Sequence, residues 1–401
     1  VRSAHEGVGL SKSWFATVEK MGVEVRYESA ATELLQDSRG RIAGVRVRGP
    51  NGVEDISAKA VVLGAGGFEA NTHMRAQYLG SPWDQAKVRG TPHNQGDGLR
   101  MALDAGAMAW GQWSGCHSTP ISADWGHFAP RELTEPEIRT AIAEAIGVDF
   151  DYEILSVLPW TRRELVAERY RAGNVFIAGD AAHLMSPTGG FGMNTGVGDI
   201  IDLSWKIDAT LQGWGGEALL DSYESERIPV AQRAVTEASG NLGRMLSAEA
   251  SPQLLDDTEE GAKVRQQAGI HISQAMKREW ETLGIHLGYI YADSPICIAD
   301  GTPAPGDDPT DYVQNTWPGS RAPHVWLADG RSTLDLFGRG FVLLCLGADT
   351  VETGTLEDVA KAVGLPLEIV RLTEEAVFEV YEKKLVLVRP DGHVAWRDDA
   401  I

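Results

Sequence analysis

The sequence NVFIAGDAAHLMSPTGGFGMNTGVG, which occupies residues 174–198, decides the fold of this chain. Its apolar run at residues 175–178 predicts a short, buried, parallel β-strand that stops at Gly179 and Asp180. A carboxylate accepts hydrogen bonds and has none to donate. We therefore expect Asp180 to bind hydroxyl groups rather than phosphates.

A glycine-rich loop and a helix follow this acid. Three glycines in residues 186–194 leave room for backbone amides to approach a ligand: Gly189, Gly190 and Gly192. We expect the helix to begin with Asn194 or Thr195 as its N-cap and to end at Gly213. Its expected apolar face consists of residues spaced three and four apart: Ile200, Leu203, Ile207 and Leu211. A helix N-terminus favours negative charge by about 0.3–1 kcal/mol, so the stretch predicts a socket for a polar ligand with anionic character.

Two motifs in this stretch, GDAAH at residues 179–183 and PTGGFGMN at residues 187–194, resemble the second flavin-contacting motif of the flavin-dependent aromatic hydroxylases. That family includes the p-hydroxybenzoate, phenol and 3-(3-hydroxyphenyl)propionate hydroxylases, and the resemblance runs from about Pro130 to the C-terminus. It implies FAD, with its ribityl chain on Asp180, Pro187 near the isoalloxazine and the amides around residues 192–194 at the pyrimidine edge. The cofactor-binding residues that it implies are Gly179, Asp180, Pro187, Gly190, Gly192, Met193 and Asn194. The alternative is a strand–loop–helix corner whose glycines only allow tight packing.

The chain of 401 residues is long enough for two or three domains, and its 43% hydrophobic and 23% charged residues are typical of globular proteins. A net charge of -21 argues against nucleic acid and anionic membrane surfaces as partners, because phosphate neutralisation needs clustered Lys and Arg. Three distant cysteines, none in a CxxC pair, argue against a disulfide framework or a zinc knuckle, and we expect no metal site: Cys116, Cys297 and Cys345. With no apolar run of about 18 residues and no signal-peptide core, the expected location is the cytoplasm.

The first third of the chain predicts an alternation of helix and strands. We expect a helix at residues 10–21 and a parallel strand at 23–27. A small antiparallel excursion at 31–56 and a return to the main sheet at 60–68 should follow. In the last run, Gly64, Ala65 and Gly66 suggest a nucleotide-binding turn, but the GxGxxG pattern fails because Glu69 occupies its sixth position. These three residues are either a tight strand exit or a direct cofactor contact.

Residues 1–125 also resemble a second flavoprotein group, the fumarate reductase and tricarballylate dehydrogenase type, through segments 22–29, 58–69 and 86–102. This resemblance implies that Ala31 lies near the adenine of FAD and that Asp97 contacts the flavin. His117 is either a contact to a substrate carboxylate or a histidine in a Trp-rich corner. Both families begin with a strand–GxGxxG–helix unit for the FAD pyrophosphate, and the printed sequence shows none. We therefore expect a fusion of two flavoprotein segments without that unit.

The rest of the chain predicts helices followed by a small α/β domain. We expect a surface helix at residues 135–146, a strand at 152–158 and a short helix at 162–171. A helical pair at 217–246, kinked at Pro229, and a helix from about 260 to Leu283 should follow. A Pro-, Gly- and Asp-rich linker follows at residues 299–319. The order beyond it resembles the thioredoxin-like tail of the phenol hydroxylases: strand 340–346, helix 357–363, strand 367–372 and a hairpin at 384–396. Because it has no CxxC pair, we expect it to serve packing or homodimer formation.

The expected fold is α/β. It combines an incomplete Rossmann-like FAD-binding domain of the glutathione-reductase type with a helical segment and a C-terminal thioredoxin-like α/β domain. The expected boundaries are 1–125 for the fumarate-reductase-like fragment, 126–298 for the hydroxylase-like segment, 299–319 for the linker and 320–401 for the C-terminal domain.

Three functions remain open from the sequence. The leading hypothesis is an FAD-dependent monooxygenase that takes electrons from NAD(P)H and uses O2 to hydroxylate a small aromatic, phenolic substrate. No catalytic acid or base can be assigned to it. The second is an FAD-linked dehydrogenase or reductase of a small carboxylic acid, for which Arg89, Arg100 and His117 are the candidate carboxylate contacts. The third is a non-catalytic flavoprotein remnant that mediates association.

Overall fold

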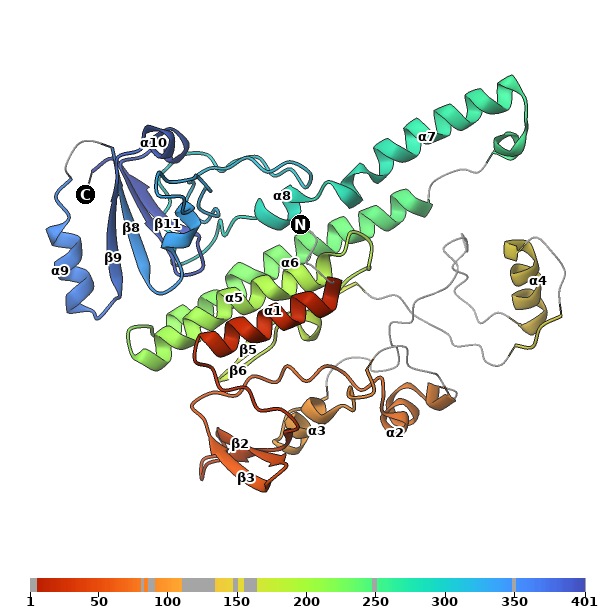
Figure 1. The fold of residues 1–401 in the computed structure, drawn as a ribbon, viewed down its shortest axis with the longest axis horizontal. Helices are drawn as coiled ribbons and strands as arrows, with labels where there is room; N and C mark the ends of the chain where they lie inside the picture. The colour runs from red at the N-terminus through yellow and green to blue at the C-terminus, as the bar shows by residue number, and fades with distance from the viewer. Residues whose placement is uncertain are drawn as a thin grey trace. The chain divides into compact units, whose positions relative to one another are not determined.

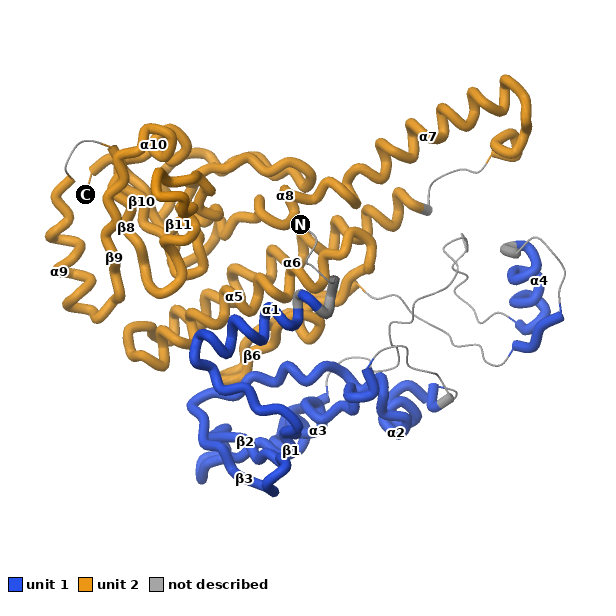
Figure 2. The backbone as a smooth tube through the Cα atoms, in the orientation of Figure 1, with its two compact units in different colours: residues 1–161 blue, residues 162–401 orange. Residues whose placement is uncertain are grey.

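The computed structural model describes residues 6–80, 83–85, 91–109, 134–146, 151–154, 164–246, 251–347 and 351–400. The chain forms two compact units, residues 1–161 and 162–401, which are coloured separately in Figure 2. Both units mix helices with strands, which confirms the α/β class. Within the described residues, no helix combines the length and the hydropathy that crossing a membrane requires.

Unit 1 contains a three-stranded antiparallel sheet with the strand order β1-β2-β3. Its helices and strands are α1 (Glu6–Lys20), β1 (Ala30–Gln36), β2 (Ile42–Gly49), β3 (Gly52–Ser57), α2 (Thr72–Met74), η1 (Arg75–Leu79), η2 (Trp83–Gln85), α3 (Asp97–Asp104) and α4 (Glu135–Ile146). The predicted hairpin is present, with Gly49 paired to Gly52 across its turn. Helix α3 packs against β1, where Gln36 Nε2 donates to the carbonyl of Ala105 at 3.0 Å.

Two strands predicted in unit 1 are wrong. Residues 23–26 are irregular and residues 27–28 form a turn, in which Glu28 has a φ of 52°. Residues 60–67 form no strand either. An extended run becomes a strand only when a neighbour pairs with its backbone, and no described strand pairs with these runs. The antiparallel excursion is therefore the only predicted sheet that the described part of unit 1 contains.

Unit 2 begins with two small antiparallel strand pairs. β4 (Leu165–Val166) pairs with β7 (His183–Leu184), and β5 (Arg171–Ala172) pairs with β6 (Val175–Phe176). The predicted helix at 162–171 is therefore wrong where the residues are described, and the predicted parallel strand at 175–178 is a two-residue antiparallel one. The physical reason is the turn at Gly173, whose φ of 60° folds β6 back on β5 and leaves Val175 62% exposed.

Two long helices, α5 and α6, lie side by side in the middle of unit 2 (Figure 1). The helical elements of this region are η3 (Gly179–Ala181), α5 (Phe191–Gln212), α6 (Glu217–Leu246), η4 (Pro252–Leu255), α7 (Glu259–Trp280) and α8 (Leu283–Leu287). Helix α6 continues through Pro229 as one element, and α5 ends at the predicted Gly213, whose φ is 88°. Thr258 caps α7, accepting from the amide of Gly261 at 3.1 Å.

The buried face of α5 is partly charged, which corrects half of the apolar face expected from the sequence. Leu203 and Ile207 do pack in a hydrophobic cluster. Ile200 and Leu211 are 47% and 43% exposed. The side chains of Asp199, Asp202 and Lys206 are buried instead. Burying charge is costly unless each group is paired, so α5 must be surrounded by partners from other elements.

A four-stranded sheet with the order β11-β10-β8-β9 ends the chain, with β8 and β9 parallel and the other pairs antiparallel. Its elements are η5 (Thr333–Leu336), β8 (Phe341–Leu346), α9 (Gly354–Ala362), β9 (Leu367–Leu372), α10 (Glu375–Tyr381), β10 (Leu385–Val388) and β11 (Val394–Asp398). Alternate residues of β8 enter two clusters: Leu344 packs with Tyr381 of α10, whereas Leu343 packs with Leu356 of α9. The sheet is therefore covered on both faces, which explains its continuous apolar strands.

Candidate functional site

Gly179 and Asp180 form a single tight turn directly after β6. Gly179 has a φ of 58°, a conformation that favours glycine. The Asp180 side chain is exposed, and no described residue forms a hydrogen bond or an ion pair with its carboxylate. A carboxylate held in a tight turn with both oxygens free is suited to accept hydrogen bonds from a ligand.

The glycine-rich loop delivers free backbone amides next to that turn. Gly190 donates its amide to the carbonyl of Pro187 at 3.1 Å, which closes a turn in which Gly189 and Gly190 have φ values of 85° and 66°. Helix α5 starts at Phe191, and its N-cap is Gly190, with no side-chain cap. The first amides of the helix consequently have no partner within the helix.

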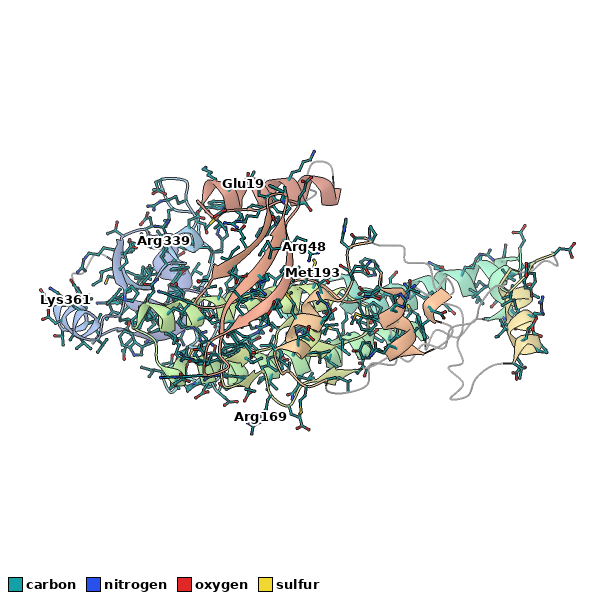
Figure 3. The ribbon with its side chains drawn as sticks, turned by 90° about the horizontal axis from the view of Figure 1, so that it is seen from below. Glu19, Arg48, Arg169, Met193, Arg339 and Lys361 are labelled. Atoms are coloured by element: carbon teal, nitrogen blue, oxygen red, sulfur yellow. The ribbon has the colours of Figure 1, made fainter. Side chains whose placement is uncertain are left out.

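The helix therefore begins earlier than the sequence predicts, since Asn194 and Thr195 lie inside its first turns. The Asn194 side chain donates to the Gly190 carbonyl at 2.9 Å instead of capping the amides. Met193, labelled in Figure 3, is 77% exposed. A Cβ placed on Gly190 would meet nothing within 4 Å, so the space in front of the amides is open.

Two anchors hold the loop against α6 and α8. Thr188 is buried, and its Oγ1 donates to the carbonyl of Ala238 in α6 at 2.6 Å. The Phe191 side chain, 1% exposed, packs in a cluster with Ala238 and Ile285 and makes an edge contact with the His286 ring at 5.5 Å between centroids. These contacts fix the amides rather than leaving them on a mobile loop.

A buried network centred on Asp199 ties the Gly179–Asp180 turn to α5. Asp199 Oδ2 accepts from the Gly179 amide at 2.9 Å and lies 2.8 Å from His183 Nε2, and its Oδ1 accepts from Arg227 Nε at 2.8 Å. Arg227, from α6, also donates to the Tyr291 hydroxyl at 3.2 Å. Burial alone would raise the pKa of Asp199, but the hydrogen bond from His183 and the charge of Arg227 outweigh it and hold that pKa below its usual value.

The same turn touches the helix directly. A Cβ placed on Gly196 would lie 3.1 Å from the Cα of Gly179, so the two glycines allow the turn to pack against the second turn of α5. The structure thus brings together the residues predicted in unit 2: the Asp180 turn packs on the helix whose N-terminus the glycine-rich loop forms.

Unit 1 brings most of its predicted residues together by itself. The Gly64–Gly66 segment lies against the start of α3, because a Cβ on Gly98 would be 3.2 Å from the Cβ of Ala65. Asp97 is the first residue of α3 and forms an exposed ion pair with Arg100 at 3.4 Å. Ala31 lies in β1 opposite Val47.

The residues proposed to contact a substrate carboxylate are either outside the described residues or already paired. Arg89 and His117 lie outside the described residues, as does Cys116. Arg100 is occupied in ion pairs with Asp97 and, at 4.0 Å, with Asp104.

A second buried cluster, here called the ion cluster, joins α5 and α6 to the C-terminal hairpin. It consists of Asp202, Lys206, Glu226, Arg389 and Asp391. Arg389 donates to Glu226 at 2.6 and 2.9 Å, to Asp202 at 3.1 Å, and to Asp391 at 2.6 and 3.1 Å. Lys206 donates to Asp202 at 2.7 Å and to Glu226 at 2.5 Å. None of these side chains is more than 1% exposed.

Reasoning from the sequence missed the Asp199 network and the ion cluster. One signal was present: Asp199, Asp202 and Lys206 recur three and four residues apart inside a helix, which places them on one face. A charged stripe is usually solvated, and only the partners on α6 and the C-terminal hairpin reveal that this one is buried.

Three family models match the chain. An FAD binding domain matches residues 101–238, which include the Asp180 turn and the glycine-rich loop. The C-terminal domain of aromatic-ring hydroxylases matches residues 315–401. A different FAD binding domain matches residues 2–115, which agrees with the expected change of family between the two parts.

Curated relatives and solved structures agree with these matches. Aklavinone 12-hydroxylase RdmE of Streptomyces purpurascens is 31% identical over 96% of this chain and 72% of its own length. FAD-dependent monooxygenase apdD of Emericella nidulans is 37% identical over 62% of this chain and 42% of its own length. The structure of the flavin-dependent monooxygenase PieE in complex with FAD and substrate is 27% identical, with a TM-score of 0.64, over 98% of this chain and 77% of that one.

The fold and the family models thus define an α/β protein with FAD binding domain sequences. The chain belongs to the family of FAD-dependent aromatic-ring hydroxylases, which are monooxygenases. It spans about half the length of the first curated relatives that it matches, namely 42%, 50% and 46%.

Proposed function

We propose that this chain binds FAD at the Asp180 turn and the start of α5, and that it acts as a monooxygenase on a phenolic substrate with O2 and NAD(P)H. The observation that carries the proposal is the Asp180 carboxylate, which no described residue pairs, in a turn that packs on α5, whose N-terminus has no side-chain cap. The donor and acceptor chemistry fits FAD, because the carboxylate can accept from ribityl hydroxyls and the amides can donate to a carbonyl edge of the flavin. When bound, the flavin supplies the redox and oxygen chemistry of the reaction.

The chain's own residues would bind and orient the cofactor. Gly179 and Asp180 would hold the ribityl chain, and Pro187 would lie near the ring system. The amides of residues 192–194, in the helix that begins after Gly190, would face its pyrimidine edge. In unit 1, we assign Ala31 to the adenine side and the Gly64–Gly66 turn and Asp97 to further contacts with FAD. No described residue is assigned as a catalytic acid or base.

We infer the domain layout from the same resemblance: a Rossmann-like FAD-binding fragment at residues 1–125, a second flavin-binding segment with helices at 126–298, a linker at 299–319 and a thioredoxin-like domain at 320–401. The β8–α9–β9–α10–β10–β11 order with parallel β8 and β9 supports the last assignment. A packing or homodimer role for that domain and a cytoplasmic location complete the proposal.

The first test is the flavin absorbance of the purified chain after incubation with FAD and desalting. We expect retained flavin in the unaltered chain and weaker retention in Asp180→Asn. A hydrogen bond to a charged group contributes about 1.5–3 kcal/mol, so the dissociation constant should rise about 10- to 100-fold. Asp208→Asn makes the same substitution on an exposed position of α5 and should leave retention unchanged.

The second test follows NAD(P)H oxidation and O2 uptake with a panel of phenols. Uptake of O2 that depends on a phenol supports the monooxygenase. Dye reduction by a small carboxylic acid without O2 would favour the dehydrogenase instead. If the unaltered chain keeps no flavin, both the monooxygenase and the dehydrogenase hypotheses are overturned, and the non-catalytic remnant is the remaining hypothesis.

A further inference from the structure

The Asp180 carboxylate forms no hydrogen bond or ion pair with the described residues, so its placement depends on the turn that carries it. That turn is held against α5 by the hydrogen bond from the Gly179 amide to Asp199, by the contact of the following His183 with the same carboxylate, and by the close approach of Gly179 to Gly196. Asp199 and Gly196 belong to the helix whose N-terminus faces the same space. The position of the carboxylate relative to the helix amides therefore depends on Asp199 and Gly196.

Asp199 is itself fixed from three sides. Its side chain is 0% exposed and contacts Gly179, His183 and Arg227, which come from three different segments. Arg227 donates in addition to the carbonyl of Thr195 at 3.0 Å, one turn before Asp199. A side chain that is buried, charged and hydrogen-bonded on both oxygens has a single available orientation.

We propose that Asp199 is a positioning residue, which fixes the Gly179–Asp180 turn on α5 so that Asp180 meets the ribityl chain of a flavin bound at the helix N-terminus. Asp199 does not touch the ligand, and it acts through the Gly179 amide. This inference rests on the proposed function, because it names how the flavin-binding geometry of that site is maintained.

Asp199→Asn is the direct test, since it keeps the shape of the side chain but replaces an acceptor oxygen by an NH2 that faces donors. In the flavin-free protein, hydrogen exchange of the peptide covering residues 179–184 should become faster than in the unaltered chain. Asp208→Asn, the same substitution on the exposed face of α5, should leave that exchange unchanged. Exchange that stays as slow in Asp199→Asn as in the control overturns the inference.

Ligand binding separates positioning from general damage. Flavin fluorescence should show FAD binding weakened about tenfold or more in Asp199→Asn. Lumiflavin, which has no ribityl chain, should bind to both proteins equally. In an Asp180→Asn background, adding Asp199→Asn should produce no further loss. Equal losses for FAD and lumiflavin, or additive losses in the double variant, would show a merely structural role and overturn the inference.

Gly196→Ala tests the same distance without disturbing charge, in case Asp199→Asn does not fold. Alanine favours helix over glycine, but its Cβ would push the Gly179 turn away from α5. FAD binding should weaken while the thermal midpoint holds or rises. Gly243→Ala in α6, where a Cβ meets nothing within 4 Å, is the matched control and should leave binding unchanged. If Gly196→Ala binds FAD as well as the unaltered chain does, the inference is overturned but the proposed function is not. If the unaltered chain binds no flavin, both are overturned.

Discussion

Replacing Arg389 by Met should destabilise unit 2 strongly, although Arg389 is far from the candidate site along the chain. Its guanidinium pairs with three buried carboxylates; without it Lys206 remains beside Asp202 and Glu226, and Asp391 loses its guanidinium partner. Removing one partner of a buried ion pair typically costs about 3–5 kcal/mol. A domain is stable by only about 5–15 kcal/mol, so this variant should lie close to the limit of folding.

Urea unfolding followed by circular dichroism at pH 7 measures this loss. Arg331→Met is the matched control, because the Arg331–Asp329 pair is exposed and should contribute less than about 1 kcal/mol. The loss from Arg389→Met should shrink at pH 5, since carboxylates that have lost their cation take up protons more readily. High salt should change it little, because buried pairs are poorly screened.

The double variant Arg389→Met with Glu226→Gln should be less destabilised than the sum of its single changes, because the second substitution removes a charge that the first leaves unpaired. A loss below about 1 kcal/mol at pH 7, or one that equals the loss in Arg331→Met, would refute the view that the ion cluster holds the C-terminal hairpin to the helices.

Two further predictions concern the pH dependence of stability at Glu226 and the packing of Phe191, which anchors the glycine-rich loop. Burial would raise the pKa of Glu226, but Arg389 and Lys206 outweigh it and lower that pKa from 4.5 to about 2, so the stability it contributes should be present above pH 4.5 and disappear as the pH falls toward about 2. Urea midpoints measured across that range should lose part of this pH dependence in Glu226→Gln, and an unchanged slope would contradict the assignment. Phe191→Ala should lower the free energy of unfolding by about 3–5 kcal/mol through the cavity that it leaves, measured by thermal unfolding. Phe15→Ala, at a 49% exposed position, is its control, and equal effects would contradict the anchoring role.

The sequence predicts well those elements whose determinants are local. Helix α4 covers the predicted residues 135–146, and β9 covers the predicted residues 367–372. The end of α5 at Gly213 follows from a glycine that can adopt a positive φ. Each of these depends on periodicity or turn chemistry within a few residues.

The predictions that were wrong depend on partners in other elements of the chain. The run at residues 175–178 reads as a parallel strand, but Gly173 turns it back on β5, and the partner strand decides its pairing. The face that α5 buries depends on Arg389, which lies 187 residues from the Asp202 that it contacts. The candidate site shows the same division, because the Asp180 motif is readable locally whereas the Asp199 support needs Arg227 from another helix.

Neighbouring residues of α6 serve both buried networks. Glu226 belongs to the ion cluster and Arg227 to the Asp199 network, so adjacent positions on one helix bind the C-terminal hairpin and support the Gly179–Asp180 turn. A small rotation of α6 cannot serve one network without disturbing the other. Exchanging the C-terminal sheet for that of a relative should therefore change the position of the Asp180 turn. A chimera that works must take α6 from the same protein as the sheet that α6 contacts.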